Sequence, residues 1–157
     1  MDGLAIARAV HVLALVHWIG GLAMVTLVIL PSLLRVDDPG QRLALFEAVE
    51  GRFSRQARIS VLLVGLSGFY MTWRYDAWSR FADPQYWWMH AMVCLWALFT
   101  VMLFVAEPLF LHRWFAGRTL KRPDPAFRFA LRAHQVVLAV SSVTIAGAVV
   151  GVHGAWF

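Results

Sequence analysis

The chain has 157 residues, of which 61% are hydrophobic and 15% are charged, and its mean hydropathy is +0.66. Soluble domains carry about 25% charged residues, so this composition excludes an ordinary soluble domain. A single cysteine excludes a disulfide framework and a thiolate-clustered metal site. The 14 Lys and Arg exceed the 9 Asp and Glu only modestly. They lie in loops between apolar runs, which is typical of membrane topology and argues against nucleic acid as a partner.

Uncharged apolar runs indicate where the chain crosses a bilayer, which takes about 20 helical residues. Three runs without Asp, Glu, Lys or Arg exceed this length: Ala9 to Leu34, Tyr86 to Ala106, and Ala133 to Phe157. A fourth run, Ile59 to Trp73, is shorter, and we expect its helix to continue on both sides. Upstream of it, apolar side chains recur at helical spacing, which predicts an amphipathic extension (Leu43, Phe46, Val49 and Phe53).

The predicted fold is therefore an all-α, integral-membrane four-helix bundle that forms a single domain over residues 1–157. The spans are expected at about 4–34, 55–75, 85–112 and 126–153. Membrane strands are excluded because the runs are uniformly apolar and do not alternate. In the last connection, Pro123-Asp124-Pro125 indicates a break followed by the start of the fourth helix.

The basic residues predict the orientation, because Lys and Arg concentrate on the cytoplasmic side. The first and third connections hold 11 of the 14: Arg35, Arg42, Arg52, Arg55, Arg58, Arg113, Arg118, Lys121, Arg122, Arg128 and Arg132. Both termini are then expected outside, in the periplasm of a Gram-negative bacterium, with the protein in the inner membrane. An aromatic belt is expected at the outer interface (Trp73, Trp78, Trp87, Trp88 and Trp156).

Six histidines in so apolar a chain are the main functional signal, since ionisable groups within a span mark candidate sites. At 1.5 Å per residue, His11 lies roughly 10 Å below the outer surface, His17 roughly 20 Å and His90 roughly 8 Å. His153 is expected at the outer surface, and His112 and His134 in the cytoplasmic half.

His11 and His90 thus fall on different helices at similar depth, as a haem with two histidine ligands requires. Gly68, Gly147 and Gly151 would give room for a macrocycle, although the last two also fit a small-residue contact between helices, which we favour.

Simpler interpretations stand beside the haem. A membrane histidine can bond a neighbouring helix or face a cavity, and interfacial His112 and His153 are favoured as residues without a ligand role. His17 lies about 240° around the helix from His11, so one haem cannot easily use both. A deeper second haem on His17 and His134 is left open, although their depths differ by roughly 8 Å.

Two further groups carry alternatives. Glu107 precedes Pro108, which is expected to kink the third helix, and we favour structural pairing of the carboxylate with Arg58, Arg132 or His134 over proton transfer. Soft ligands near the start of that helix (Met89, His90, Met92 and Cys94) suit Cu(I), but His90 points about 100° away from Met89. No nucleophile–base pair, phosphate loop or dinucleotide fingerprint is present in the sequence.

The first span contains His11, six further residues, and then Trp18-Ile19-Gly20-Gly21. This resembles the opening helix of HemJ-type protoporphyrinogen oxidases and of the related CopD-type copper-resistance membrane domains. Trp88-Met89-His90-Ala91-Met92 resembles the Trp-x-His-x-Lys entry of the HemJ family, with Met92 in place of the lysine. The charged run before the second span has a similar character (Glu47, Glu50, Arg52 and Arg55). The resemblance implies a b-type haem with His11 as a ligand, while Met92 counts against the oxidase activity.

The sequence hypothesis is therefore a membrane protein that holds at least one haem b between His11 and His90. Trp18 is expected to pack on the porphyrin, and Arg8 or Arg74 to neutralise its propionates. The expected function is electron transfer between a membrane quinol or partner protein and an acceptor on the outer face. Alternatives are a HemJ-like porphyrinogen oxidase, a copper-binding or copper-transport protein, and a structural subunit. Whether the protein is an enzyme, which redox partner it has and whether it forms an oligomer are left open.

Overall fold

The computed structural model describes residues 3–111, 117–119 and 122–153, and these residues are helical with short connections and no strand. The first helical run consists of α1 (Gly3–Met24), a π-helical segment η1 (Val25–Ile29) and α2 (Leu30–Leu33). It is followed by α3 (Pro39–Arg74), the short 3-10 turns η2 (Ala77–Ala82) and η3 (Pro84–Tyr86), α4 (Trp87–Val101), the π-helical segment η4 (Met102–Leu111) and α6 (Pro123–Val152).

The helix starts follow from local sequence. The Asp38 carboxylate accepts a hydrogen bond from the backbone N–H of Gly40 at 2.8 Å, and Pro39 occupies the first position of α3. Asp83 caps η3 in the same way through Gln85 N–H at 2.9 Å. The last helix begins at Pro123, so the segment Pro123-Asp124-Pro125, expected to be a break before the helix, forms its first turn. The α3 helix includes the amphipathic segment expected upstream of its apolar half.

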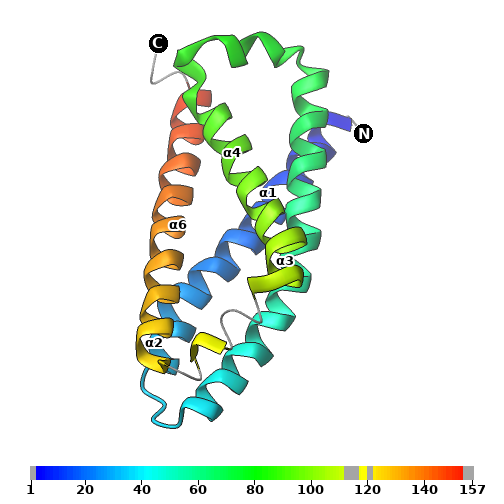
Figure 1. Cartoon of the computed structure of the whole chain (residues 1–157). Coiled ribbons are helices and arrows are strands. Elements are labelled where there is room, and N and C mark those ends of the chain that lie inside the picture. Colours follow the sequence, from blue (N-terminus) through cyan, green and yellow to red (C-terminus); the bar gives the residue numbers. More distant parts are fainter. Residues whose placement is uncertain (1–2, 112–116, 120–121, 154–157) are drawn as a thin grey trace.

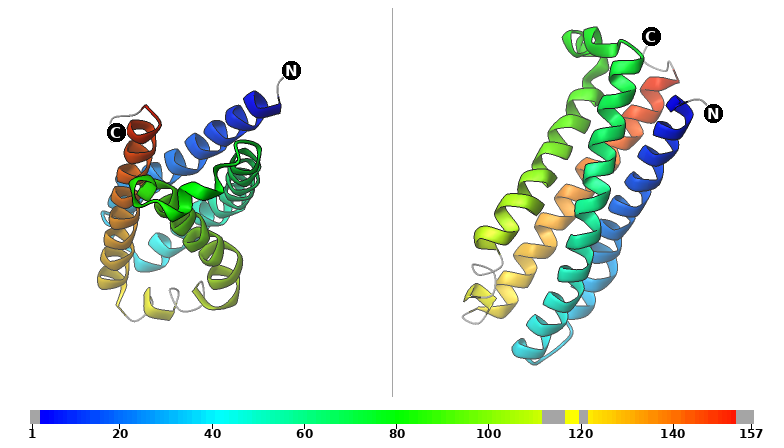
Figure 2. Two further views of the ribbon diagram at one scale, coloured as in Figure 1. Left: turned by 90° about the horizontal axis from the view of Figure 1, so that it is seen from above. Right: turned by 90° about the vertical axis from the view of Figure 1, so that its right-hand side faces the viewer.

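The long helices lie side by side, with α1 packed chiefly against α3 and α4 against α6 (Figures 1 and 2). Gly3 and the last turn of α6 lie at the same end of the molecule (Figure 1). We call this the termini end, which also holds Arg74 at the end of α3. The opposite end, where α3 and α6 begin, is called the basic end.

Three helices of the described chain are long and apolar enough to cross a membrane: Gly3–Leu33, Pro84–Leu109 and Pro123–Val152. They coincide with three of the four expected spans. The apolar half of α3 lies between Arg58 and Arg74 and is not among these helices, so a span at 55–75 stays a prediction. Large apolar side chains on the outer faces are exposed, for example Leu13 (70%) and Leu66 (69%), as contact with lipid requires.

Two clusters of buried apolar side chains join the helices. One lies toward the basic end and includes Leu30, Phe46 and Phe127. The other lies nearer the middle, where Trp18 of α1 packs with Val61 of α3. The two clusters share Phe53 at their margin, so the α1–α3 interface is packed along most of its length.

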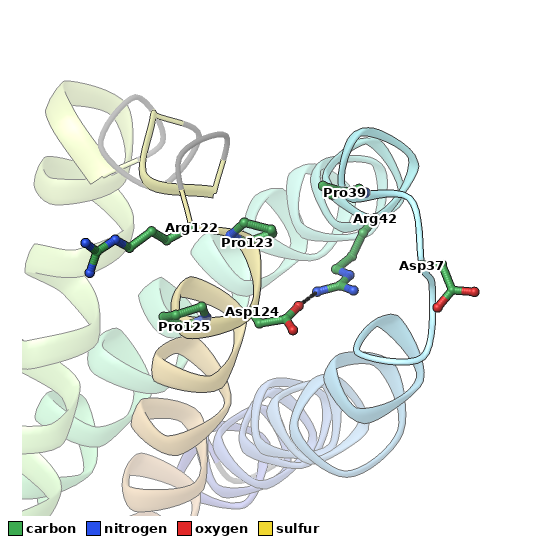
Figure 3. A pocket seen from close by; sticks show the side chains of 7 residues that line it. All are labelled: Asp37, Pro39, Arg42, Arg122, Pro123, Asp124 and Pro125. Atoms are coloured by element: carbon green, nitrogen blue, oxygen red, sulfur yellow. Dashed lines mark hydrogen bonds and ion pairs between the residues drawn. The ribbon is translucent and has the colours of Figure 1, made fainter.

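An ion pair closes the basic end (Figure 3). Arg42 is 5% exposed and donates from Nη1 to Asp124 Oδ1 at 2.7 Å. Its Nε and Nη2 donate to the Val36 carbonyl at 3.0 and 2.6 Å, and its guanidinium lies 5.5 Å from the centre of the Phe127 ring. A pocket of about 480 Å³ adjoins this pair. The Arg42 donors are thus occupied by Asp124 and the Val36 carbonyl. Arg42 therefore has a structural role, in which it links the start of α3 to the start of α6.

Candidate functional site

His11 is half-buried on α1 and faces α3. Its Nδ1 lies 3.0 Å from Ser67 Oγ and 3.1 Å from the Val64 carbonyl oxygen. The close approach depends on Gly68, because a Cβ at that position would lie only 3.2 Å from Cε1 of His11. The imidazole is therefore held by the neighbouring helix rather than by its own.

These contacts define the tautomer of His11. A carbonyl oxygen can only accept, so Nδ1 must carry the proton that is donated to Val64. Ser67 Oγ donates its own proton to the Leu63 carbonyl at 2.5 Å and is thus an acceptor for Nδ1–H as well. The lone pair of Nε2 is left free, and no described residue forms a hydrogen bond with this atom. A metal-binding histidine is typically oriented in this manner, with one ring nitrogen anchored and the other available.

His17 also faces α3, where its Nδ1 lies 2.9 Å from Ser60 Oγ. Since a hydroxyl can donate or accept, this contact leaves the tautomer of His17 open. His17 is exposed, whereas His11 is half-buried. Ser60 and Ser67 lie two helical turns apart on one face of α3, so the α1–α3 interface carries two successive histidine–serine pairs.

His90 lies in the first turn of α4 and is exposed. Its ring packs edge-on against Phe81 in η2, with 5.4 Å between the ring centres. No hydrogen bond to the imidazole is formed by the described residues. The structure thus places His90 toward the termini end but against a different element from the one that holds His11.

The levels of His11 and His90 follow from two contacts. Trp18 packs on Phe99 with ring centres 4.6 Å apart, so these two residues lie at the same level. His11 precedes Trp18 by seven residues and His90 precedes Phe99 by nine, which places His90 about 3 Å nearer the termini end than His11. The indole Nε1 of Trp96 donates to the Val61 carbonyl at 3.0 Å, and its ring packs on Phe69. The residues of α3 that hold His11 lie between these two positions, so Trp96 is level with His11. Because His90 precedes Trp96 by six residues, this second count places His90 about 9 Å nearer the termini end than His11.

The other predicted haem contacts have protein partners. Trp18 is 4% exposed and packs within the middle cluster, and its Nε1 has no hydrogen-bond partner among the described residues. Arg8 Nη2 donates to the Tyr75 hydroxyl at 2.5 Å, and the guanidinium of Arg74 lies 5.9 Å from the centre of the Trp73 ring. Both arginines lie at the termini end, so their role toward propionates stays a prediction.

The glycines of α6 serve helix packing, as favoured from the sequence. A Cβ on Gly147 would lie 2.5 Å from the Trp87 indole, and one on Gly151 would lie 2.5 Å from the Trp88 indole. The space at these two positions is therefore filled by side chains of α4.

The remaining histidines form hydrogen bonds with their own helix or lie outside the described residues. His134 Nδ1 donates to the Ala130 carbonyl at 2.9 Å, and His153 Nδ1 to the Val149 carbonyl at 2.7 Å. His112 lies outside the described residues. Across residues 3–111, 117–119 and 122–153, no three His, Cys, Asp or Glu side chains form a metal-binding group.

Glu107 pairs with Arg58, which confirms the structural pairing expected from the sequence. Arg58 Nη2 lies 3.4 Å from Glu107 Oε1, and Arg58 Nε donates to the Leu103 carbonyl at 3.0 Å. Leu103 and Glu107 both belong to η4, where Pro108 interrupts regular α-helical hydrogen bonding. Nearby on α3, burial raises the pKa of the Glu50 carboxyl to about 7, with smaller contributions from the charges of Glu107 and Glu47.

Sequence reasoning missed the two serines that anchor His11 and His17. The available signal was the occurrence of Ser60 and Ser67 seven residues apart in an otherwise apolar stretch. Buried hydroxyls at this spacing lie on one helix face and need acceptors or donors on the same helix or its neighbour.

Comparisons of the chain with family models, curated proteins and solved structures gave no match.

Proposed function

We propose that the protein is a transmembrane four-helix bundle that binds a b-type haem toward its termini end and transfers electrons. His11 and His90 are the proposed axial ligands. The observation that supports this proposal is the state of His11, whose Nδ1–H is anchored on Val64 and Ser67 while Nε2 forms no hydrogen bond with any described residue. A haem held by two histidines supplies reversible one-electron chemistry.

The residues around His11 have separate roles in this proposal. Ser67 and Val64 fix the ring and its tautomer, which strengthens the ligand. Gly68 allows the imidazole to lie against α3. Trp18 and its apolar neighbours exclude water from the middle of the helices, which raises the electrostatic effect of every nearby charge.

His90 is the proposed second ligand because it lies on α4 toward the same end and its imidazole has no hydrogen-bond partner among the described residues. Phe81 limits the rotation of its ring. Arg8 and Arg74 are the cations proposed to meet the propionates at that end. The excess of basic residues at the opposite end supports an orientation with both termini outside the cytoplasm of a bacterial inner membrane.

The test is the dithionite-reduced minus oxidised visible spectrum of detergent-purified protein produced with ample haem. Wild type, His11→Ala, His90→Ala and a matched control, His17→Ala, are compared. We expect sharp b-type bands in the wild type and the control and their loss in the other two variants. A colourless wild type refutes the proposal, and bands that survive loss of His11 refute the assigned ligand.

The same preparation separates the alternatives that the sequence left open. Copper without iron in the metal analysis would replace the haem by a copper site. Rescue of a strain that lacks protoporphyrinogen oxidase would make the protein an enzyme of porphyrinogen oxidation. Absence of both metals from correctly folded protein would leave a structural role.

A further inference from the structure

A groove lies between α1 and α3 toward the basic end, away from the histidines. It has a volume of about 400 Å³ and is walled by Gly21, Met24 and Ile29 on the first helical run and by Val49 and Phe53 on α3. Its volume falls in the range of ligand sites, about 300–1,000 Å³. The wall is apolar apart from two side chains of α3, Arg52 and Gln56.

Arg52 differs from the other arginines of α3. The others contact a carboxylate, a carbonyl or an aromatic ring: Arg42 with Asp124, Arg55 with Gly51, Arg58 with Glu107 and Arg74 with Trp73. Arg52 is exposed and, in the part of the chain that the structure describes, has no hydrogen bond, ion pair or ring contact. Its guanidinium therefore presents free donors at the margin of an apolar groove, a combination that favours an anion with an apolar body.

The depth of Arg52 matches a lipid headgroup. His17 lies near the middle of the Gly3–Leu33 helical run and contacts Ser60. Arg52 lies eight residues before Ser60, about 12 Å toward the basic end, while half the hydrocarbon thickness is about 15 Å. An arginine at this level extends its head to the interface. Gln56 lies one turn deeper, about 6 Å, at a level occupied by the acyl chains of a phospholipid.

We propose that this groove binds one anionic phospholipid, with an acyl chain along the apolar wall and the phosphate on Arg52. A neutral quinone head would leave the Arg52 charge uncompensated, so a phospholipid is favoured by the charge of the site. Basic pockets between helices near the cytoplasmic leaflet commonly recognise such headgroups. The site is separate from the histidines and does not depend on haem.

Native mass spectrometry of the purified full chain tests the proposal with phosphatidylglycerol and phosphatidylcholine of identical acyl chains. We expect one phosphatidylglycerol to be retained in preference to phosphatidylcholine. Arg52→Gln should weaken its retention about tenfold, as expected for loss of a charge-assisted hydrogen bond. The control Arg35→Gln removes an exposed charge outside the groove and should have little effect.

A second pair of variants tests the groove itself without changing charge. Ala48 lines the groove and Ala44, one turn away on α3, does not. Ala48→Phe should displace the lipid, whereas Ala44→Phe should not. Equal retention of the two lipids, equal loss in both arginine variants or full retention in Ala48→Phe overturns the proposal. Displacement of phosphatidylglycerol by stoichiometric decylubiquinone also overturns it and assigns the groove to a quinone.

Discussion

Glu50 makes the stability of the protein depend on pH near neutrality. Its carboxyl has a pKa of about 7 in the folded chain against an ordinary value of 4.5, chiefly because burial disfavours the charged form, and secondarily because Glu107 and Glu47 lie near it. A folded-state pKa above the unfolded one means that the folded state binds the proton more tightly. The contribution of Glu50 to stability is therefore most favourable below pH 4.5 and falls as the pH rises to about 7.

The size of this effect follows from the difference between the two pKa values. Each pKa unit corresponds to 1.36 kcal/mol, so the contribution of Glu50 to the unfolding free energy is expected to fall by about 3 kcal/mol across this interval. In Glu50→Gln the side chain stays neutral, so this component should vanish. At pH 8 the variant should be more stable than the wild type by about the same amount, and at pH 4 the two should agree.

Thermal unfolding in a mild detergent, followed by circular dichroism between pH 4 and pH 8, measures this difference. Glu47→Gln is the matched control, because it removes a nearby carboxylate on the same helix and affects Glu50 only through a minor charge interaction. If the wild type and Glu50→Gln show parallel pH profiles, Glu50 is not buried as described and the reasoning is refuted.

Two further predictions concern the histidine site and the helix contacts. Ser67→Ala removes one of two acceptors for the ring N–H of His11 and should weaken haem binding about tenfold in a titration of apoprotein, the smallest effect typical for residues that hydrogen-bond a metal ligand. Ser60→Ala should not weaken it, and equal effects of the two substitutions would contradict the role assigned to His11. Gly151→Ala places a Cβ 2.5 Å from an indole of α4 and should destabilise by about 1–2 kcal/mol in thermal unfolding, since overpacking costs 1–3 kcal/mol. A Cβ at Gly20 would lie in open space, so Gly20→Ala should stabilise by up to about 1 kcal/mol. If Gly20→Ala were the more destabilising of the two glycine substitutions, the packing described for Gly151 would be contradicted.

The helical elements could be predicted from the sequence because their signals are local. Uncharged runs longer than a bilayer crossing coincide with α1, with α4 and its continuation η4, and with α6. Prolines mark the starts of α3 and α6, and the Asp38 carboxylate caps α3. The π-helical segments could not be predicted from apolar periodicity, because one inserted residue changes the hydrogen bonding without changing composition.

The partners within the site depend instead on how helices cross. The sequence placed His11 in the first span, but only the crossing of α1 and α3 brings it to Ser67, and the same crossing brings His17 to Ser60. The pairing of Arg42 with Asp124 joins residues 82 positions apart and lies equally beyond local reasoning. The pairing of Glu107 was expected from the cost of a lone charge in a membrane, which restricts its partners to few cations.

The two halves of α3 explain why this helix is less apolar than the other three. Its second half contains the hydroxyls that anchor both histidines of α1, and a serine within an apolar helix costs little when its proton is donated to the carbonyl one turn before, as Ser67 does with Leu63. Its first half carries Arg52, the proposed phosphate contact, and Glu50, whose carboxyl has a pKa raised to about 7. A more apolar α3 would have the hydropathy of a membrane-spanning helix, but it would lack the hydroxyls that contact His11 and His17 and the arginine at the margin of the groove.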